Sequence, residues 1–364
     1  MENNKHILIL GGTGAMGTYL TPLLASQGGV EVYCTSRSFH QNKKNLKYLQ
    51  GNATDLAFLS KVLKLHHWDA IVNFMAYSTQ VFRQLYEKFL NATDQYVFLS
   101  SSRVYASSEE PITEDSPRLL DVCKDADYLV TDEYALAKAR QENILFNSGR
   151  KNWTIIRPYV TFSDYRLQLS CEEKESWLYR CLHGRTIVFS KDLASKITTF
   201  TLGEDVARGM AAVIGSKEAL GEAFHITNPQ SYTWQEISTW YLDAISKETG
   251  TRPKIYMAEY YRPYFGGNMP QVKYDRLYNR KFDNSKIGQF IDVSTFKPTH
   301  KALEDCIHNF IANPRFGNIN WIHEALKDKL VGEWASPKEI LTIKGKKTKA
   351  KYLLTRLGLY HPKL

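Results

Sequence analysis

The residues best suited to chemistry in this sequence are a tyrosine and a lysine four positions apart, Tyr134 and Lys138. Residues at this spacing lie on one face of a helix, so the phenol and the ammonium can point into the same cleft. A nearby cation favours the phenolate and lowers a tyrosine pKa that is normally about 10. The pair is therefore predicted to act as an acid and base in proton transfer.

A serine-rich segment about thirty residues upstream strengthens this interpretation. It contains Ser100, Ser101 and Ser102 and ends an apolar stretch, Tyr96 to Ser100, that is predicted to be a strand. In an open parallel sheet, ligands bind beyond the carboxyl ends of the strands. The serines are therefore expected where a ligand cleft is also expected.

A glycine-rich turn follows the first predicted strand, His6 to Leu10, and precedes a run that favours a helix from Thr18. Glycines in its first half allow a tight turn and a close approach of the backbone, and Gly17 lets the helix pack near the strand. Backbone N–H groups are then free to bind a pyrophosphate. The sequence thus predicts a dinucleotide site that includes Gly11, Thr13, Gly14, Ala15, Met16 and Gly17.

The residues after the second predicted strand, Val30 to Cys34, bear on the choice of dinucleotide. NAD-selective sites usually carry an acid here to hold the adenosine ribose. This sequence has Ser36 and Arg37 instead. A hydroxyl and a guanidinium suit the additional phosphate of NADP, which favours NADP slightly over NAD. The alternative is that Arg37 is an ordinary surface residue of a loop.

The elements that must position these groups alternate between short apolar strands and amphipathic helices, which predicts an α/β fold with a doubly wound parallel sheet of the Rossmann type and a smaller C-terminal substrate domain. The expected strands are His6–Leu10, Val30–Cys34, Ala70–Phe74, Tyr96–Ser100 and Thr154–Arg157, and the expected helices are Met16–Gln27, Asp55–Leu65, Val81–Leu90 and Tyr134–Asn147.

The domain organisation follows from a change of texture in the second half of the chain. A nucleotide-binding domain is expected over 1–162, with 198–230 returning to it, and a substrate-binding domain over 163–197 and 231–330. The remainder, 331–364, is expected to be a basic extension, because eight Lys and Arg residues stand against the single acid Glu339 from Lys338 onward. Such a run can bind nucleic acid or a membrane surface, but a solvated appendage is the favoured interpretation.

Composition excludes several other classes of protein. The apolar run at Ile7 to Leu10 is too short for a membrane span or a signal peptide. The five cysteines form no CxxC pair and their number is odd, which favours a reducing, cytoplasmic location. No group of residues has the spacing of a zinc site, so no metal is expected.

The ordered set of the glycine turn, Ser101 with Val104-Tyr105, Tyr134 with Lys138, and Arg157-Pro158 resembles the extended short-chain dehydrogenase/reductases, a family that includes nucleotide-sugar epimerases, dehydratases and reductases. The resemblance implies that Tyr134 transfers the proton. It also implies that Lys138 contacts the nicotinamide ribose and that Ser101 hydrogen-bonds the reacting oxygen. Further cofactor contacts that it implies are Asn52 at the adenine, Phe74 and Pro158.

The function expected from this resemblance is an NAD(P)-dependent reductase or epimerase acting on a nucleotide-linked sugar. A dehydratase is least favoured, since Ser102-Arg103 stand where those enzymes carry an Asp-Glu pair. The alternative is an atypical relative that binds RNA or senses the cofactor without catalysis, although nucleic acid is not the favoured partner. A homodimer is common in the family. Candidate cations for the substrate's diphosphate are Arg252, Lys273, Arg276 and Arg280.

Overall fold

The computed structural model describes residues 4–363, which fall into two units. The first unit holds the chain up to residue 163, together with 199–230 and 280–297, and the second holds 164–198, 231–279 and the chain from 298 on. The segment 280–297 therefore differs from the sequence-based assignment, which put it in the substrate domain. Its Ile287 and Phe296 pack into the apolar core beneath the central sheet, and this packing places it in the first unit.

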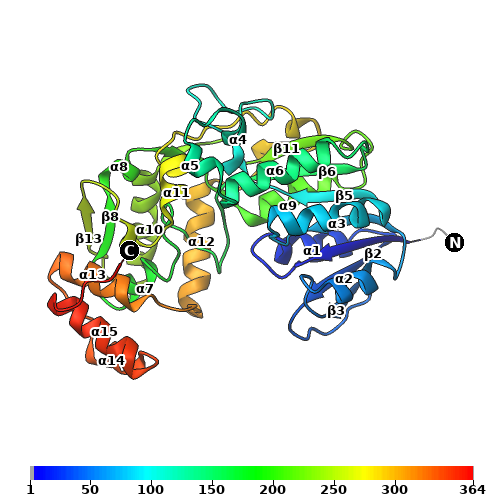
Figure 1. Ribbon diagram of the computed structural model, residues 1–364. Helices are drawn as coiled ribbons and strands as arrows, with labels where there is room; N and C mark the ends of the chain where they lie inside the picture. The colour runs from blue at the N-terminus through cyan, green and yellow to red at the C-terminus, as the bar shows by residue number, and fades with distance from the viewer. Residues whose placement is uncertain (1–3, 364) are drawn as a thin grey trace. The chain divides into compact units, whose positions relative to one another are not determined.

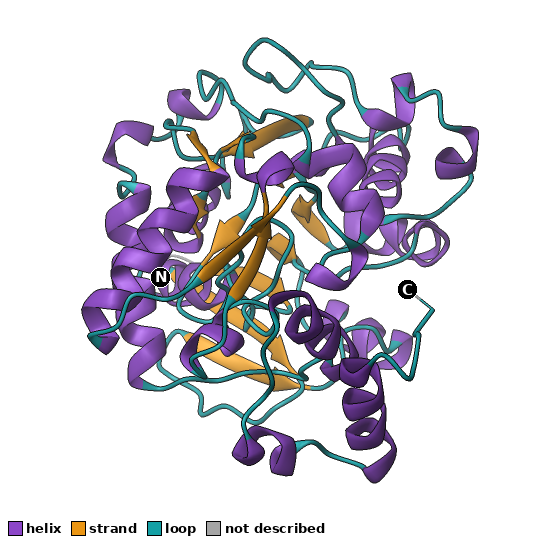
Figure 2. Ribbon diagram, turned by 90° about the vertical axis from the view of Figure 1, so that its left-hand side faces the viewer, coloured by secondary structure: helices purple, strands orange, loops and turns teal. Residues whose placement is uncertain are grey.

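The first unit is built on a sheet of seven parallel strands, which confirms the expected α/β fold (Figures 1 and 2). Its order is β11-β6-β5-β4-β1-β2-β3, so the order reverses between β1 and β4, where doubly wound sheets bind their ligands. The strands are β1 (Lys5–Leu10), β2 (Val30–Ser36), β3 (Leu46–Gln50), β4 (Trp68–Asn73), β5 (Thr93–Leu99), β6 (Trp153–Pro158) and β11 (Glu222–Ile226).

Helices cover both faces of this sheet, because alternate residues of each strand point to opposite sides. Ile7 and Ile9 of β1 join one core, where α1 (Gly17–Ala25) and α9 (Gly203–Val213) pack. Leu8 and Leu10 join the other core, and the helices on that face are α2 (Leu56–Leu63), α3 (Thr79–Asn91) and α6 (Tyr134–Phe146). Shorter elements complete the unit: η1 (Ser102–Val104), α4 (Leu119–Val122), α5 (Ala126–Leu129), β7 (Thr161–Phe162), β10 (Thr201–Leu202), η4 (Ile287–Gln289) and η5 (Val293–Thr295).

The second unit is mainly helical. Helix α10 (Trp234–Thr249) packs against α12 (Thr299–Ala312), and β8 (Ile187–Ser190) pairs in parallel with β13 (Ile255–Ala258). Its other elements are α7 (Leu178–Leu182), α8 (Lys191–Ala194), β9 (Ile197–Thr198), β12 (Tyr232–Thr233), η2 (Pro263–Phe265), α11 (Met269–Gln271), η3 (Val272–Arg276), α13 (Trp321–Val331), α14 (Pro337–Thr342) and α15 (Lys346–Leu357).

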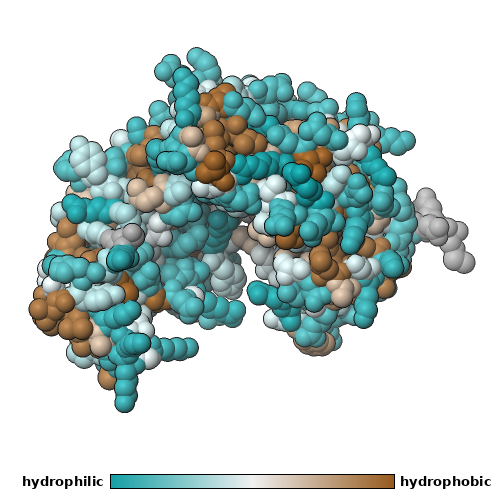
Figure 3. Space-filling model, viewed as in Figure 1, coloured by the Kyte–Doolittle hydropathy of each residue, from teal (hydrophilic) through white to brown (hydrophobic). Residues whose placement is uncertain are grey.

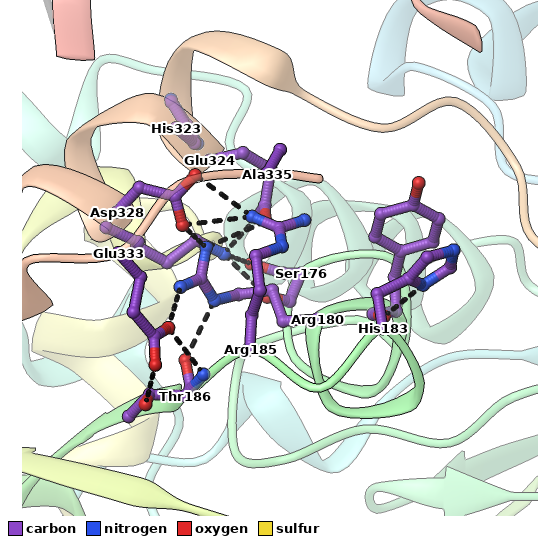
Figure 4. Close-up of polar contacts among 12 residues, drawn as sticks. Ser176, Arg180, His183, Arg185, Thr186, His323, Glu324, Asp328, Glu333 and Ala335 are labelled. Carbon is purple, nitrogen blue, oxygen red and sulfur yellow. Dashed lines mark hydrogen bonds and ion pairs between the residues drawn. The ribbon is translucent and has the colours of Figure 1, made fainter. Parts of the chain in front are cut away.

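A buried cluster of charged side chains joins α7 to α13 (Figure 4). The Arg180 guanidinium lies 2.9 Å from Glu324 Oε2 and 2.8 Å from Asp328 Oδ1. Arg185 contacts the same two carboxylates and also donates to Glu339 on α14. Because each buried carboxylate has a cationic partner, the cluster holds these helices in one arrangement.

The C-terminal segment is folded onto this unit, in contrast to the solvated appendage expected from its charge. Tyr352 of α15 is buried, and its hydroxyl donates to Asp328 Oδ2 at 2.8 Å and accepts from the Ala335 N–H at 2.7 Å. The segment was misjudged because its buried tyrosine is surrounded in sequence by lysines. Over residues 4–363, no helix combines the length and the apolar content needed to cross a membrane.

Candidate active site

The glycine turn after β1 requires glycine at two positions. Gly11 has a φ of +74°, and a Cβ there would lie 2.8 Å from the sulfur of Met75. Its N–H donates to Thr35 Oγ1 at 3.0 Å, which fixes the start of the turn. A Cβ on Gly17 would lie 2.6 Å from backbone atoms of Gly12, so α1 can pack this close to the turn only with glycine there.

The outer part of this turn fits a dinucleotide. A Cβ on Gly14 would meet nothing nearer than the Gly11 carbonyl oxygen at 3.9 Å, so open space lies beside the backbone. Met16 precedes the first turn of α1 and makes no capping hydrogen bond with its side chain. A helix start that lacks a side-chain cap and an acidic residue attracts an anion such as a pyrophosphate.

The central strands bring the other predicted residues to the same edge of the sheet. The Phe74 N–H donates to the Leu10 carbonyl at 3.0 Å, so Phe74 lies beside the glycine turn. Asn73 of β4 pairs with Phe98 of β5, and Ser101 lies two residues after Leu99, the carboxyl end of β5. The sequence-based placement of these residues at one strand edge is reproduced by this register.

Helix α6 carries the tyrosine and the lysine to this edge. Tyr134 is its first residue, and 40% of that residue is exposed, whereas Lys138 is buried. The Lys138 ammonium donates to the Leu99 carbonyl at 2.7 Å, at the end of β5. It lies 5.9 Å from the centre of the Tyr134 ring and 4.6 Å from that of Phe98. The lysine therefore joins the helix to the strand end and places its charge near the phenol.

The protonation of Lys138 depends on two opposing effects. Burial lowers the pKa of Lys138 to about 8, and the Glu142 carboxylate, one turn further along α6, acts in the opposite direction. At neutral pH the lysine is therefore mainly charged, and it loses its charge within about one unit above pH 8. A cation at this position stabilises the phenolate form of Tyr134.

Sequence analysis missed Glu142, which is fully buried behind this pair. Its carboxylate accepts from Arg157 Nε at 2.8 Å, from Arg157 Nη2 at 2.9 Å and from Ser100 Oγ at 2.6 Å. Arg157 also donates to the Tyr105 hydroxyl at 2.9 Å. The sequence does contain a signal for this contact: Glu142 stands four residues after Lys138, on the same helical face, and Arg157 belongs to the Arg157-Pro158 motif already noted.

Ser101 and Arg103 lie on the tyrosine side of the site. Ser101 is buried, and its hydroxyl oxygen accepts from the Arg103 N–H at 3.2 Å. The Arg103 guanidinium lies 5.3 Å from the centre of the Tyr134 ring and 2.7 Å from Glu133 Oε1. Arg103 was noted in the sequence only as a departure from the dehydratase pattern, and its position over the tyrosine was not foreseen.

The residues expected at the adenosine end follow the next strands along the same edge. Ser36 ends β2, and its hydroxyl oxygen accepts from the Ser38 N–H at 3.2 Å. Arg37 is exposed and has no hydrogen bond or ion pair within residues 4–363. Asn52 follows β3, and its amide oxygen is occupied by the N–H and hydroxyl of Thr54. Pro158 is buried at the end of β6.

Three of the cations proposed for a diphosphate already have other partners. Arg280 is buried in the first unit and donates to the Tyr105 and Ala106 carbonyls. Arg276 is buried beside Asp275, and Arg252 pairs with Asp243 at the surface. These contacts give Arg276 and Arg280 structural partners, and Lys273 lies over the Tyr274 ring; a role of the four cations in substrate binding stays a prediction.

The fold and this site are those of a Rossmann-type α/β protein with a glycine turn at the switch point of its sheet and a tyrosine and lysine pair at the neighbouring end of β5. Residues 7–227 match the NAD dependent epimerase/dehydratase family, and the chain belongs to that family.

Solved structures with the same fold include three named enzymes. The epimerase Mth375 of Methanothermobacter thermautotrophicus is 20% identical, with a TM-score of 0.63 over 85% of this chain and 93% of that one. The UDP-glucuronic acid 4-epimerase of Bacillus cereus, solved with UDP-glucuronic acid and NAD, is 16% identical, with a TM-score of 0.62 over 84% and 99%. The dTDP-glucose 4,6-dehydratase of Bacillus anthracis, solved with NAD, is 16% identical, with a TM-score of 0.62 over 85% and 97%.

One curated relative has a different kind of name, the chloroplast stem-loop binding protein of 41 kDa b from Arabidopsis thaliana. It is 22% identical over 251 residues, which make up 65% of this chain. The matched part spans 62% of that relative's length.

Proposed function

We propose that this protein is an NAD(P)-dependent oxidoreductase, a reductase or an epimerase, that acts on a nucleotide-linked sugar. The observation that carries the proposal is the position of Lys138. Its ammonium is bound to the strand end at Leu99 and lies 5.9 Å from the Tyr134 ring, at the sheet edge that also holds the glycine turn. A family member with this arrangement has the groups for proton transfer where the dinucleotide binds.

The residues of the chain divide the work as follows. The glycine turn and the start of α1 would hold the pyrophosphate of a nicotinamide dinucleotide, which when bound would supply hydride transfer to or from a carbon of the sugar. Tyr134 Oη transfers the proton of the alcohol or ketone oxygen at that carbon. Lys138 holds the phenolate form by its charge, and Ser101 Oγ donates a hydrogen bond to the same oxygen. Arg103, over the ring, adds a second positive charge near the phenol.

The nicotinamide cofactor is either NAD or NADP, and the two candidates have different support. Two of the solved structures with the same fold, from Bacillus cereus and Bacillus anthracis, are complexes with NAD, which supports NAD. Exposed Arg37 after β2 supports a slight preference for NADP, because a guanidinium pairs with the 2′-phosphate. Dissociation constants of both cofactors for the protein and for Arg37→Ala test the preference. A variant that binds NADP as tightly as the parent would exclude a role for Arg37.

The substrate class is proposed on the basis of family membership and of the bound UDP-glucuronic acid in the Bacillus cereus structure. We assign substrate binding to the second unit as a prediction from the sequence. A cytoplasmic location and a homodimer also belong to the proposal. Five free cysteines, three of them buried, support a reducing compartment.

The experiment compares Tyr134→Phe with the parent protein on a panel of UDP- and dTDP-linked sugars. Turnover is followed by nicotinamide absorbance for a reductase and by sugar analysis for an epimerase. The variant keeps the ring and loses the titrating hydroxyl, so kcat should fall by roughly a hundredfold or more while cofactor affinity is retained. Tyr260→Phe, on an exposed tyrosine of the second unit, is the matched control. Unchanged turnover in Tyr134→Phe would refute the catalytic role.

The alternative function is an RNA-binding or cofactor-sensing protein without catalysis. The name of the Arabidopsis relative and the basic C-terminal segment support RNA binding. The enzyme is favoured, because burying the charge of Lys138 costs free energy and has no evident use in a protein that only binds RNA. RNA binding that survives Tyr134→Phe, together with no turnover of any sugar nucleotide, would reverse this order.

A further inference from the structure

The net charge of the chain is concentrated in its last residues. Residues 337–363 contain eight Lys and Arg and the single acid Glu339, a balance of +7, whereas the whole chain has +9. Glu339 does not reach the surface: it is buried, and its carboxylate accepts from Arg185 at 2.9 Å and from the Ser336 N–H at 2.9 Å. The surface of this segment is therefore cationic and has no acidic group of its own.

The exposed lysines of this segment are also unpaired. Lys338, Lys344, Lys346 and Lys347 are exposed, and within residues 4–363 none of them makes an ion pair. Elsewhere in the second unit, exposed lysines do find carboxylates: Lys247 pairs with Glu304, and others do the same. The lysines of the C-terminal segment thus produce a positive local electrostatic field, which a polyanionic surface would neutralise.

The same segment exposes large apolar side chains. Leu341 is 75% exposed, Leu354 40%, Leu357 58% and Leu359 71%. In Figure 3, hydrophobic and hydrophilic surface lie next to each other where Figure 1 labels α14 and α15. Four exposed leucines therefore lie within nineteen residues, among the lysines, and burial of their side chains against an apolar partner would be favourable.

The lysines and leucines share faces of the two helices. On α15, the buried Tyr352 and Thr355 face the protein. From Lys347 on, the exposed positions recur at intervals of three and four residues, and Lys346 lies four residues before Ala350, so all of them lie on one outer face: Lys346, Lys347, Ala350, Leu354 and Leu357. On α14, Lys338 and Leu341 are three residues apart and both exposed, so they also share a face.

We propose that the outer faces of α14 and α15 form a docking surface for an anionic lipid bilayer. The lysines bind phospholipid headgroups, and the leucines enter the boundary between headgroups and acyl chains. RNA would neutralise the lysines but leave the leucines in water, so a bilayer accounts for both sets of side chains. The cytoplasmic leaflet is anionic, which agrees with the proposed location. This inference goes beyond the proposed function and does not depend on it.

The experiment measures cosedimentation of the full chain with two kinds of vesicle, pure phosphatidylcholine and phosphatidylcholine with about one third phosphatidylglycerol. One variant reverses two charges, Lys346→Glu with Lys347→Glu, and another removes two apolar groups, Leu354→Ser with Leu357→Ser. The matched controls lie in the first unit: Lys43→Glu with Lys44→Glu, two adjacent exposed lysines, and Leu56→Ser with Leu65→Ser, two exposed leucines. Urea unfolding verifies that all variants are folded.

The expected result is binding to the anionic vesicles only, weakened roughly tenfold or more by each C-terminal variant and unchanged by each control. Three results would overturn the proposal. The first is no binding to anionic vesicles. The second is binding that the charge reversal weakens but the serine substitutions do not, because that pattern describes a purely ionic surface. The third is tight, salt-dependent binding of a single-stranded RNA in the absence of vesicle binding, which would assign the surface to RNA.

Discussion

Replacement of Arg180 by methionine is expected to destabilise the second unit by about 3 kcal/mol. The guanidinium is fully buried, donates to Glu324 and Asp328, and also donates to the Thr186 carbonyl at 2.9 Å (Figure 4). Methionine has a similar length but no charge, so the variant leaves two buried carboxylates short of one cation.

The magnitude follows from the ionisation of Glu324. Lys327, Arg180 and Arg185 together overcome its burial and lower the pKa of Glu324 from 4.5 to about 2. At 1.36 kcal/mol per unit, this shift corresponds to about 3 kcal/mol of net stabilisation that remains after the three cations have offset the cost of burial. Removing one partner of a buried pair costs about 3–5 kcal/mol. The low end of that range applies, since Arg185 and Lys327 still contact the carboxylate in the variant.

The assay is urea unfolding followed by tryptophan fluorescence. Five of the seven tryptophans, at positions 177, 234, 240, 321 and 334, belong to the second unit, so the signal reports mainly on that unit. Arg252→Met is the matched control. Arg252 and its partner Asp243 are each more than half exposed, and loss of such a pair should cost less than about 1 kcal/mol.

The pH dependence gives a second criterion. The folded-state pKa of Glu324 is lowered, so its contribution is present above about pH 4.5 and is lost as the pH falls towards 2. The difference between the parent protein and Arg180→Met should therefore shrink over that interval. Equal stability of Arg180→Met and Arg252→Met at neutral pH would refute the reasoning, because it would mean that the buried cluster adds no more than a surface pair.

Three further predictions concern single residues of the two units. Burial raises the pKa of Glu172 to about 8, so its contribution to stability is present below about pH 4.5 and is lost as the pH rises through 8. Glu172→Gln should remove that loss, which urea unfolding at about pH 5 and about pH 9 measures. An equal loss of stability in the parent protein and the variant would contradict the prediction. In the proposed reaction, kcat/KM should fall as the pH rises above about 8, because Lys138 then loses its charge, and a pH profile that stays flat up to about pH 10 would count against this role. Gly17→Ala should weaken cofactor binding by roughly tenfold or more, since its Cβ would meet the Gly12 backbone at 2.6 Å. Gly28→Ala, with open space around it, is the control and should leave the dissociation constant of the cofactor unchanged. Equal dissociation constants for the two variants would contradict the assigned turn geometry.

The parts of the fold that could be predicted from sequence are those specified by neighbouring residues. The run of β1, glycine turn and α1 lies within about twenty residues, and each part carries its own signal of period or residue type. Strand β3 was not expected, because its sequence LKYLQ has no clear alternation and four of its five residues remain partly exposed at the edge of the sheet. Edge strands of this kind leave little pattern in a sequence.

Contacts between distant segments explain the remaining differences. Segment 280–297 joins the first unit through pairings such as Ile112 with Phe282 and the hydrogen bond from Lys297 N–H to Asp205. Its own sequence, mostly polar and charged residues with a single glycine, carries no information about those partners. The same holds for Arg103 over Tyr134, because a loop and a helix thirty residues apart meet only after the sheet has formed.

Helix α6 shows how such a contact changes the chemistry of a motif. Tyr134, Lys138 and Glu142 are spaced by four and therefore follow one stripe of the helix. Burial lowers the pKa of Lys138, and the Glu142 carboxylate acts on it in the opposite direction. Arg157 of β6 donates to both oxygens of Glu142, and Arg118 donates to the same carboxylate at 3.1 Å, so residues outside the helix hold Glu142 in place behind Lys138. The position of the carboxylate that acts on Lys138 thus depends on a strand that the four-residue spacing alone does not reveal.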